Sequence, residues 1–119
     1  MKAVPLDDGF KNVKRACQFL KSLANDNRLI ILCTLAESEK NVGELEEVLG
    51  IRQPTLSQQL ARLRADNLVS TRRSAKHIYY SLASNEAERM VGLLYELFCA
   101  EDKDGAKATA DRTDKFEVV

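Results

Sequence analysis

Apolar residues recur at intervals of three and four positions through the first part of the chain, with charged and amide side chains between them. Phe10, Val13, Cys17 and Leu20 form one such stripe. This spacing is typical of an amphipathic helix, and it predicts a first helix over about residues 10–23.

A second helix is predicted directly after the first. The short polar side chain of Asn25 or Asp26 can accept hydrogen bonds from the unpaired N–H groups of a helical first turn. Residues 28–35 are almost wholly apolar, so we expect a buried core helix with Cys33 inside it.

Two further helices are predicted with a tight turn between them. Asn41 can cap the short segment VGELEEVL, and Gly50 can end it because glycine readily takes the left-handed conformation of a helix terminus. Pro54 suits the first turn of a following helix, which we expect to start near Gln53. The apolar stripe of that helix consists of Leu56, Leu60 and Leu63.

After Asn67 the apolar period changes from helical to alternating. Residues 69–73 and 78–82 both have the composition of strands, and residues 74–76 are short and polar enough to turn between them. The sequence therefore predicts a β-hairpin.

Helical spacing returns from Glu86 to about Ala100, on a segment that is apolar on several sides and therefore needs a partner. A chain of 119 residues is long enough for one compact domain. We expect that domain over residues 10–100, with flexible segments at 1–9 and 101–119.

The order of these elements, ααααββα, is that of a winged helix-turn-helix, a mainly α fold with a β-hairpin wing. The turn Gly50-Ile51-Arg52 has the length and the glycine of a helix-turn-helix connection. In such units the helix after the turn enters the DNA major groove, where each base pair shows a different pattern of donors and acceptors.

The predicted recognition helix carries amides and hydroxyls, where an ordinary exposed helix would carry Glu and Lys. The residues that we expect to contact DNA from this helix are Gln53, Thr55, Ser57, Gln58, Gln59 and Arg62. Those expected from the wing are Arg72, Arg73 and Lys76, with His77 beside them. The alternative interpretation of the helix is a solvated polar face. That of the hairpin is a set of edge charges that discourage strand aggregation.

The formal net charge of zero first argues against a nucleic-acid partner. Residues 51–82, however, hold six basic residues against one acidic residue, a local net charge of +5. The rest of the chain is correspondingly acidic. This asymmetry favours a DNA-binding face, although a solvated charged face gives the same count.

The run VGELEEVLGIRQPTLSQQLARLRADNLVSTRR, followed by HIYYSL, resembles the helix-turn-helix and wing of the ArsR family of bacterial repressors. The resemblance covers roughly residues 10–100. Within the family, the segments ILCTL, IRQPTLSQQL and ELFCAED are similar to the biofilm growth-associated, sulfide-responsive branch (BigR and SqrR). The resemblance implies a dimeric repressor that binds an inverted-repeat operator.

The resemblance to that branch also implies a sensor made of Cys33 and Cys99. In the branch, the cysteines at these positions form a reversible sulfur bridge when reactive sulfur species rise, and the DNA is released. Inserted sulfur atoms would let such a bridge span a gap too wide for an ordinary disulfide. A buried cysteine is otherwise a small apolar residue, and no family role carries over to Cys17.

A metal sensor is not expected. Other members of the family bind metals through cysteines in the third helix, where this chain has Glu46 and Glu47, or through histidines in the last helix. The sole histidine, His77, lies in the predicted wing, so the thiolate and imidazole ligands that zinc prefers are missing. No cofactor is expected either.

The N-terminus has no apolar signal core and no apolar run approaches the length of a membrane span, so we expect a cytoplasmic protein. Three cysteines, an odd number, fit free thiols in a reducing compartment. An enzyme is not expected, because the chain has no Cys-x-x-Cys motif and no base beside either cysteine. The alternatives left open are a protein-interaction module and a constitutive DNA-binding anti-repressor without redox sensing.

Overall fold

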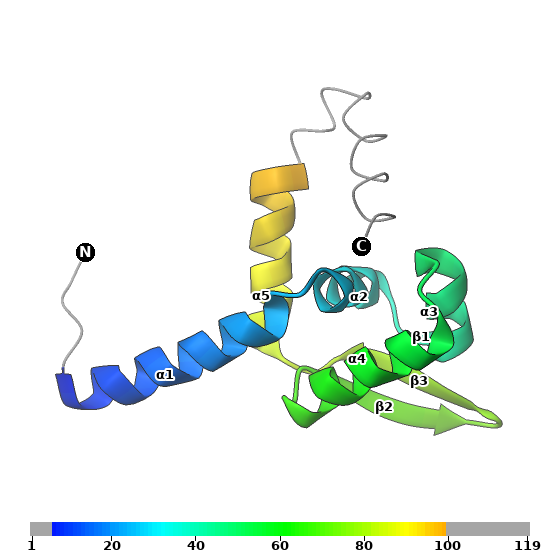
Figure 1. Ribbon diagram of the computed structural model, residues 1–119, viewed down its shortest axis with the longest axis horizontal. Coiled ribbons are helices and arrows are strands. Elements are labelled where there is room, and N and C mark those ends of the chain that lie inside the picture. The colour runs from blue at the N-terminus through cyan, green and yellow to red at the C-terminus, as the bar shows by residue number, and fades with distance from the viewer. Residues whose placement is uncertain (1–5, 100–119) are drawn as a thin grey trace.

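The structure, a computed structural model, describes residues 6–99 (Figure 1). Over these residues the elements are α1 (Leu6–Leu23), α2 (Asp26–Glu37), β1 (Lys40–Asn41), α3 (Val42–Leu49), α4 (Gln53–Ala65), β2 (Val69–Ser74), β3 (His77–Leu82), α5 (Asn85–Leu94) and the π-helical turn η1 (Tyr95–Cys99). Figure 1 shows α2, α3, α4 and the sheet gathered in one body, from which α1 and α5 extend in different directions. The predicted winged helix-turn-helix is confirmed.

Local sequence signals set the helix boundaries. The Asn25 side chain accepts from the Arg28 N–H at the start of α2. At the start of α3, Asn41 and Glu44 form a reciprocal capping box. Gly50 ends α3 in the left-handed conformation, with φ of 71°, and its N–H donates to the last turn of the helix.

The wing contains one strand more than the sequence predicts. β2 and β3 form the expected antiparallel hairpin, and β1 pairs with the other edge of β3 to give the order β1-β3-β2. In this register both Asn41 and Arg72 are partners of Tyr79. The segment before α3 is thereby tied to the wing.

The core lies between α2, α3, α4 and the start of β2, and Leu23 of α1 with Ala87 and Val91 of α5 completes it. Its six largest fully buried side chains are Ile31, Leu32, Leu45, Leu56, Leu60 and Leu63, so the predicted leucine stripe of α4 is confirmed. Cys33, which we expected inside α2, is only partly buried at the edge of this core. On β3, Tyr80 and Leu82 pack against the core, whereas Ile78 is exposed.

Two helix boundaries differ from those expected. α1 begins at Leu6 rather than at about residue 10. The last helix changes from α to π geometry at Tyr95. The predicted flexible tail, residues 101–119, lies outside the described residues.

The π-helical turn changes which side chain of the last helix faces the protein. Ala87 and Val91 are buried on the inner face of α5, and a continuous α-helix would place Phe98, seven residues after Val91, on the same face. Phe98 is instead 69% exposed, and Cys99 is partly buried. Because a π turn holds one extra residue, the position that faces the protein moves from Phe98 to Cys99.

Candidate functional site

Most of the predicted DNA-contacting residues of α4 lie on its open side. Gln53, Thr55, Ser57 and Gln58 are exposed, in contrast to the buried leucine stripe of the same helix. Short hydroxyls and amides free of acidic neighbours on α4 are suited to donor and acceptor groups on base edges. The helix begins with a proline in its first turn, as the sequence predicts.

Gln59 is partly buried and is held by Arg28 at the start of α2. Arg28 Nη1 donates to Gln59 Oε1 at 3.0 Å, while Nε and Nη2 donate to the Ser22 and Lys21 carbonyls at the end of α1. Burial lowers the pKa of Arg28, as does the nearby positive charge of Arg62. One guanidinium thus joins α1, α2 and the recognition helix.

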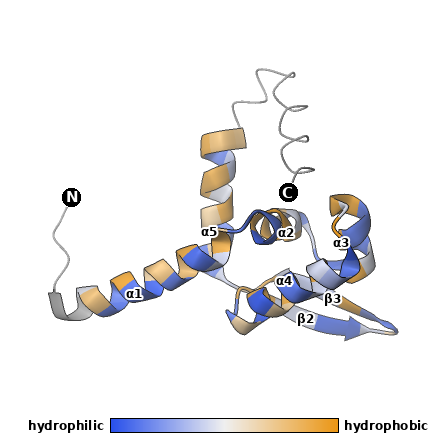
Figure 2. Cartoon of the chain, viewed as in Figure 1, coloured by the Kyte–Doolittle hydropathy of each residue, from blue (hydrophilic) through white to orange (hydrophobic). Residues whose placement is uncertain are grey.

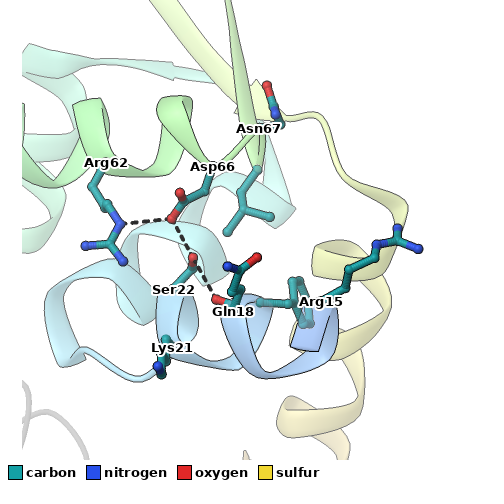
Figure 3. Close-up of a pocket in the computed structure, with 9 residues that line it drawn as sticks. Arg15, Gln18, Lys21, Ser22, Arg62, Asp66 and Asn67 are labelled. Atoms are coloured by element: carbon teal, nitrogen blue, oxygen red, sulfur yellow. Dashed lines mark hydrogen bonds and ion pairs between the residues drawn. The ribbon is translucent and has the colours of Figure 1, made fainter. Parts of the chain in front are cut away.

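Arg62 is tied to the end of its own helix. Its Nε lies 3.0 Å from Asp66 Oδ2, and the Ser22 hydroxyl donates to the same carboxylate oxygen (Figure 3). The hydrogen bonds from Ser22 and Arg62 lower the pKa of Asp66, although partial burial opposes them. These groups line a cleft of about 570 Å³ between α1 and the end of α4, together with Arg15 and Gln18.

The wing holds one arginine in an ion pair and leaves the other basic residues exposed. Arg72 on β2 donates through Nε and Nη2 to the Glu39 carboxylate, with Nε 2.9 Å from Oε1, and its guanidinium lies 4.8 Å from the centre of the Tyr79 ring. This hydrogen bonding lowers the pKa of Glu39. Arg73 and Lys76, both predicted to contact DNA, are exposed. His77 is also exposed and its ring meets that of Tyr79 edge-on.

Cys33 and Cys99 come from different helices and lie within electrostatic reach of each other. Burial raises the pKa of the Cys33 thiol, and negative charge at Cys99 and Glu37 raises it further. Both side chains are free and partly buried, whereas Cys17 on α1 is exposed. The two cysteines that the sequence singles out therefore lie on different helices, and the charge of Cys99 acts on Cys33.

Neither a metal cluster nor a membrane span is found in the part of the chain that the structure describes. Within residues 6–99, no group of three or more His, Cys, Asp or Glu side chains could hold a metal ion. No helix among these residues is long and apolar enough to cross a membrane.

Comparison with known proteins identifies the family. A model of the bacterial regulatory protein arsR family matches residues 25–71, which run from the cap of α2 into the wing. The chain is 48% identical over 101 residues to the biofilm growth-associated repressor of Agrobacterium fabrum, covering 85% of this chain and 86% of the relative. This chain belongs to the arsR family. It is 45% identical to the transcriptional activator HlyU of Vibrio cholerae, covering 83% and 94% of the two chains.

Solved structures of arsR-family regulators share the fold. BigR from Xylella fastidiosa superposes with a TM-score of 0.74 at 45% identity, over 81% of this chain and 98% of that one. Reduced HlyU from Vibrio cholerae gives 0.73 at 47% identity, over 75% and 94%. A homodimeric winged helix-turn-helix domain from Mycobacterium bovis gives 0.68 at 28% identity, over 86% and 92%.

The predicted resemblance is confirmed at the level of the family and of its biofilm growth-associated members. An arsR-family chain with this fold is a DNA-binding transcriptional regulator and not an enzyme. The structure adds three residues that the sequence did not single out, namely Arg28, Ser22 and Glu39. Only the pairing of Arg62 with Asp66 had a local signal, the i,i+4 spacing on one helix.

Proposed function

We propose that this arsR-family regulator is a cytoplasmic repressor that binds an inverted-repeat operator as a homodimer and releases it when sulfur bridges Cys33 to Cys99. The observation that carries the sensing part is that the two partly buried thiols come from α2 and η1, and that negative charge at Cys99 acts on the pKa of Cys33. The exposed polar face of α4 and the basic wing support the DNA-binding part.

Apolar surface outside the core supports the dimer. Phe10, Val13 and Leu20 on α1 are at least half exposed, as are Leu97 and Phe98 on η1. Figure 2 shows apolar residues along α1 and over most of α5 and η1, the two parts that extend from the main body. A second copy would cover this surface, as partners do for exposed apolar patches of this kind.

The bridging chemistry needs an oxidant, and a low-molecular-weight hydropersulfide, RSSH, supplies it. The Cys99 thiolate attacks the outer sulfur of RSSH, so that Cys99 becomes a persulfide and a thiol RSH leaves. The Cys33 thiolate then attacks the inner sulfur, which forms the disulfide and expels hydrogen sulfide. Overall, two protein thiols are oxidised while RSSH is reduced to RSH and H₂S. A second RSSH, reduced in the same way, supplies an additional bridging sulfur.

A bridge between α2 and η1 would act on DNA binding through the elements that these two helices contact. α2 packs on α4 and α1, and α5 leads directly into η1. Joining Cys33 to Cys99 would fix the angle between the body and the extending helices. Two recognition helices must fit successive major grooves, which repeat every ~34 Å, so a modest rotation of each protomer would disrupt binding.

The experiment that tests this function is selection of duplexes from random sequence by the reduced protein, followed by titration of the selected duplex at several salt concentrations. The proposal predicts an inverted repeat and an affinity that falls steeply as salt rises. A protein-interaction module would select nothing. A constitutive anti-repressor would select DNA but bind it with unchanged affinity after hydropersulfide treatment.

A further inference from the structure

α1 packs on the rest of the protein through its last turn. The side chains of residues 10–18 are all exposed, whereas Phe19 is partly buried and Leu23 belongs to the core. Figure 1 shows the helix projecting away from the body that holds α4. The direction of α1 relative to the recognition helix therefore depends on the contacts of this one turn.

One polar contact of the turn reaches the end of α4. Ser22 is 3% exposed, and its hydroxyl donates to the Asp66 carboxylate, which Arg62 also holds (Figure 3). A hydrogen bond to a charged acceptor is stronger than one between neutral groups. This contact fixes the C-terminal end of the recognition helix against α1.

A second contact reaches the middle of α4 through Arg28. Its Nε and Nη2 donate to the carbonyls of Ser22 and Lys21 at 2.7 and 3.1 Å. Its Nη1 donates to Gln59 Oε1 at 3.0 Å. Gln59 and Asp66 are seven residues apart, so they lie on one face of α4, about 10 Å apart along its axis. Two contacts at this separation resist both sliding and rotation of α4 against α1.

We infer that these two contacts form a joint between α1 and α4 that sets the spacing of the half-sites that the dimer accepts. The inference rests on the proposed function, in which the exposed apolar face of α1 lies in the dimer interface. Leu20 is half exposed on that face and lies in the same turn as Ser22, so the interface adjoins the joint. Apolar packing at Phe19 and Leu23 has no preferred direction, whereas hydrogen bonds do. The joint therefore determines the angle between the dimer interface and each recognition helix.

The test compares the affinity of the reduced protein for its selected inverted repeat with that for duplexes that have one base pair inserted or removed between the half-sites. One base pair moves the half-sites by about 3.4 Å and rotates them by about 35°. The wild type should bind the altered duplexes at least about tenfold more weakly, because it cannot engage both half-sites together. Ser22→Ala and Asp66→Ala each remove one contact of the joint, so α4 can pivot about the other. In both variants the loss should shrink to about threefold or less.

Thr34→Val is the matched control, since it removes a buried hydroxyl that donates within α2, to the Ile30 carbonyl at 2.8 Å. It should discriminate between the spacings as the wild type does. If Ser22→Ala does not fold, Asp66→Ala provides the test, because the Ser22 hydroxyl then still has the Gln18 carbonyl, 3.3 Å away, as an acceptor.

A variant whose affinity changes equally for all three duplexes would overturn the inference, because it would show that these contacts serve stability or charge alone. A wild type that binds all three spacings equally would overturn it too. In both cases the selected repeat is still bound, so the proposed function stands. A wild type that selects no inverted repeat would overturn the proposed function and the joint with it.

Discussion

The guanidinium of Arg72 on β2 is held by the carboxylate of Glu39, which directly precedes β1, and lies over the ring of Tyr79 on the strand between them. The predicted DNA contact of Arg72 therefore competes with an ion pair inside the protein. Both partners are exposed to solvent, where such pairs contribute little to stability. A DNA phosphate can replace the carboxylate.

Replacing Glu39 by glutamine should strengthen binding to DNA of any sequence. The variant leaves Arg72 without its charged partner, so one more cation is available to a phosphate. We expect the slope of log affinity against log salt concentration to become steeper by about 1. Fluorescence anisotropy with a selected and an unrelated duplex measures this slope.

The matched control is Glu88→Gln, which removes the same charge from the exposed start of α5, away from the wing. Its slope should equal that of the wild type. Equal changes in the two variants would show that net charge alone is responsible and that the ion pair with Glu39 does not keep Arg72 from DNA.

Charge placed on the apolar surface of η1 should separate the dimer. Phe98 is 69% exposed in a single chain, and burying a carboxylate against a second copy would be strongly unfavourable. Phe98→Glu should therefore sediment as a monomer and bind the inverted repeat at least tenfold more weakly, on the order expected when two half-sites are no longer linked.

Val48 on α3 provides the control for this experiment, since it is an apolar side chain that is 59% exposed but lies on neither α1 nor η1. Val48→Glu should sediment as the wild type does. A monomeric Val48→Glu protein, or a dimeric Phe98→Glu protein, would contradict the proposed interface.

The turn of the helix-turn-helix depends on the backbone of Gly50. This residue has φ of 71°, and no atom beyond its own chain neighbours lies within 4 Å of the position that a Cβ would occupy, so only the backbone conformation opposes a larger residue. Gly50→Ala should lower the free energy of unfolding by about 1 kcal/mol, whereas Gly50→Asn, which tolerates this conformation better, should cost less. Urea denaturation at one protein concentration compares the two, and an equal loss in both variants would argue against a conformational cause.

The raised pKa of Cys33 gives the thiol a defined pH dependence. Burial comes first among the causes, followed by charge at Cys99 and Glu37, so the neutral thiol is favoured and less thiolate is present at a given pH than in the unfolded chain. Iodoacetamide should therefore alkylate Cys33 more slowly in the folded protein than in the unfolded chain. The rate of this reaction in the folded protein should increase as the pH is raised. Cys99→Ser removes one of the causes that raise the pKa, so it should shift this rate profile to lower pH. An unchanged profile would show that the two thiols do not interact.

Features set by neighbours in the chain were predictable from the sequence. The cap at Asn41, the glycine turn at Gly50 and the leucine stripe of α4 depend on local spacing, and all three are confirmed. The hairpin was predicted for the same reason, since alternation and a short polar turn are local signals.

Features set by distant pairing were missed. β1 has only two residues and exists because β3 offers it an edge, which no local pattern indicates. The contact of Arg28 with Gln59 and that of Glu39 with Arg72 join residues about thirty positions apart. At Tyr95–Cys99 the sequence predicts that the helix continues, because the apolar residues there fit either α or π geometry.

The measurement that tests the central claim most directly is the affinity of hydropersulfide-treated protein for its selected duplex, combined with intact mass, for the wild type and for each of the three single Cys→Ser variants. We predict that each chain of the treated wild type loses the mass of two hydrogens, with or without the mass of added sulfur, as an intrachain bridge requires. This protein should bind its selected duplex at least about tenfold more weakly than the reduced protein does. Cys17→Ser, at the exposed cysteine, should behave as the wild type does, while Cys33→Ser and Cys99→Ser should keep full affinity. A bridged wild type that still binds with full affinity, or a Cys99→Ser protein that releases DNA as readily as the wild type, would contradict the account.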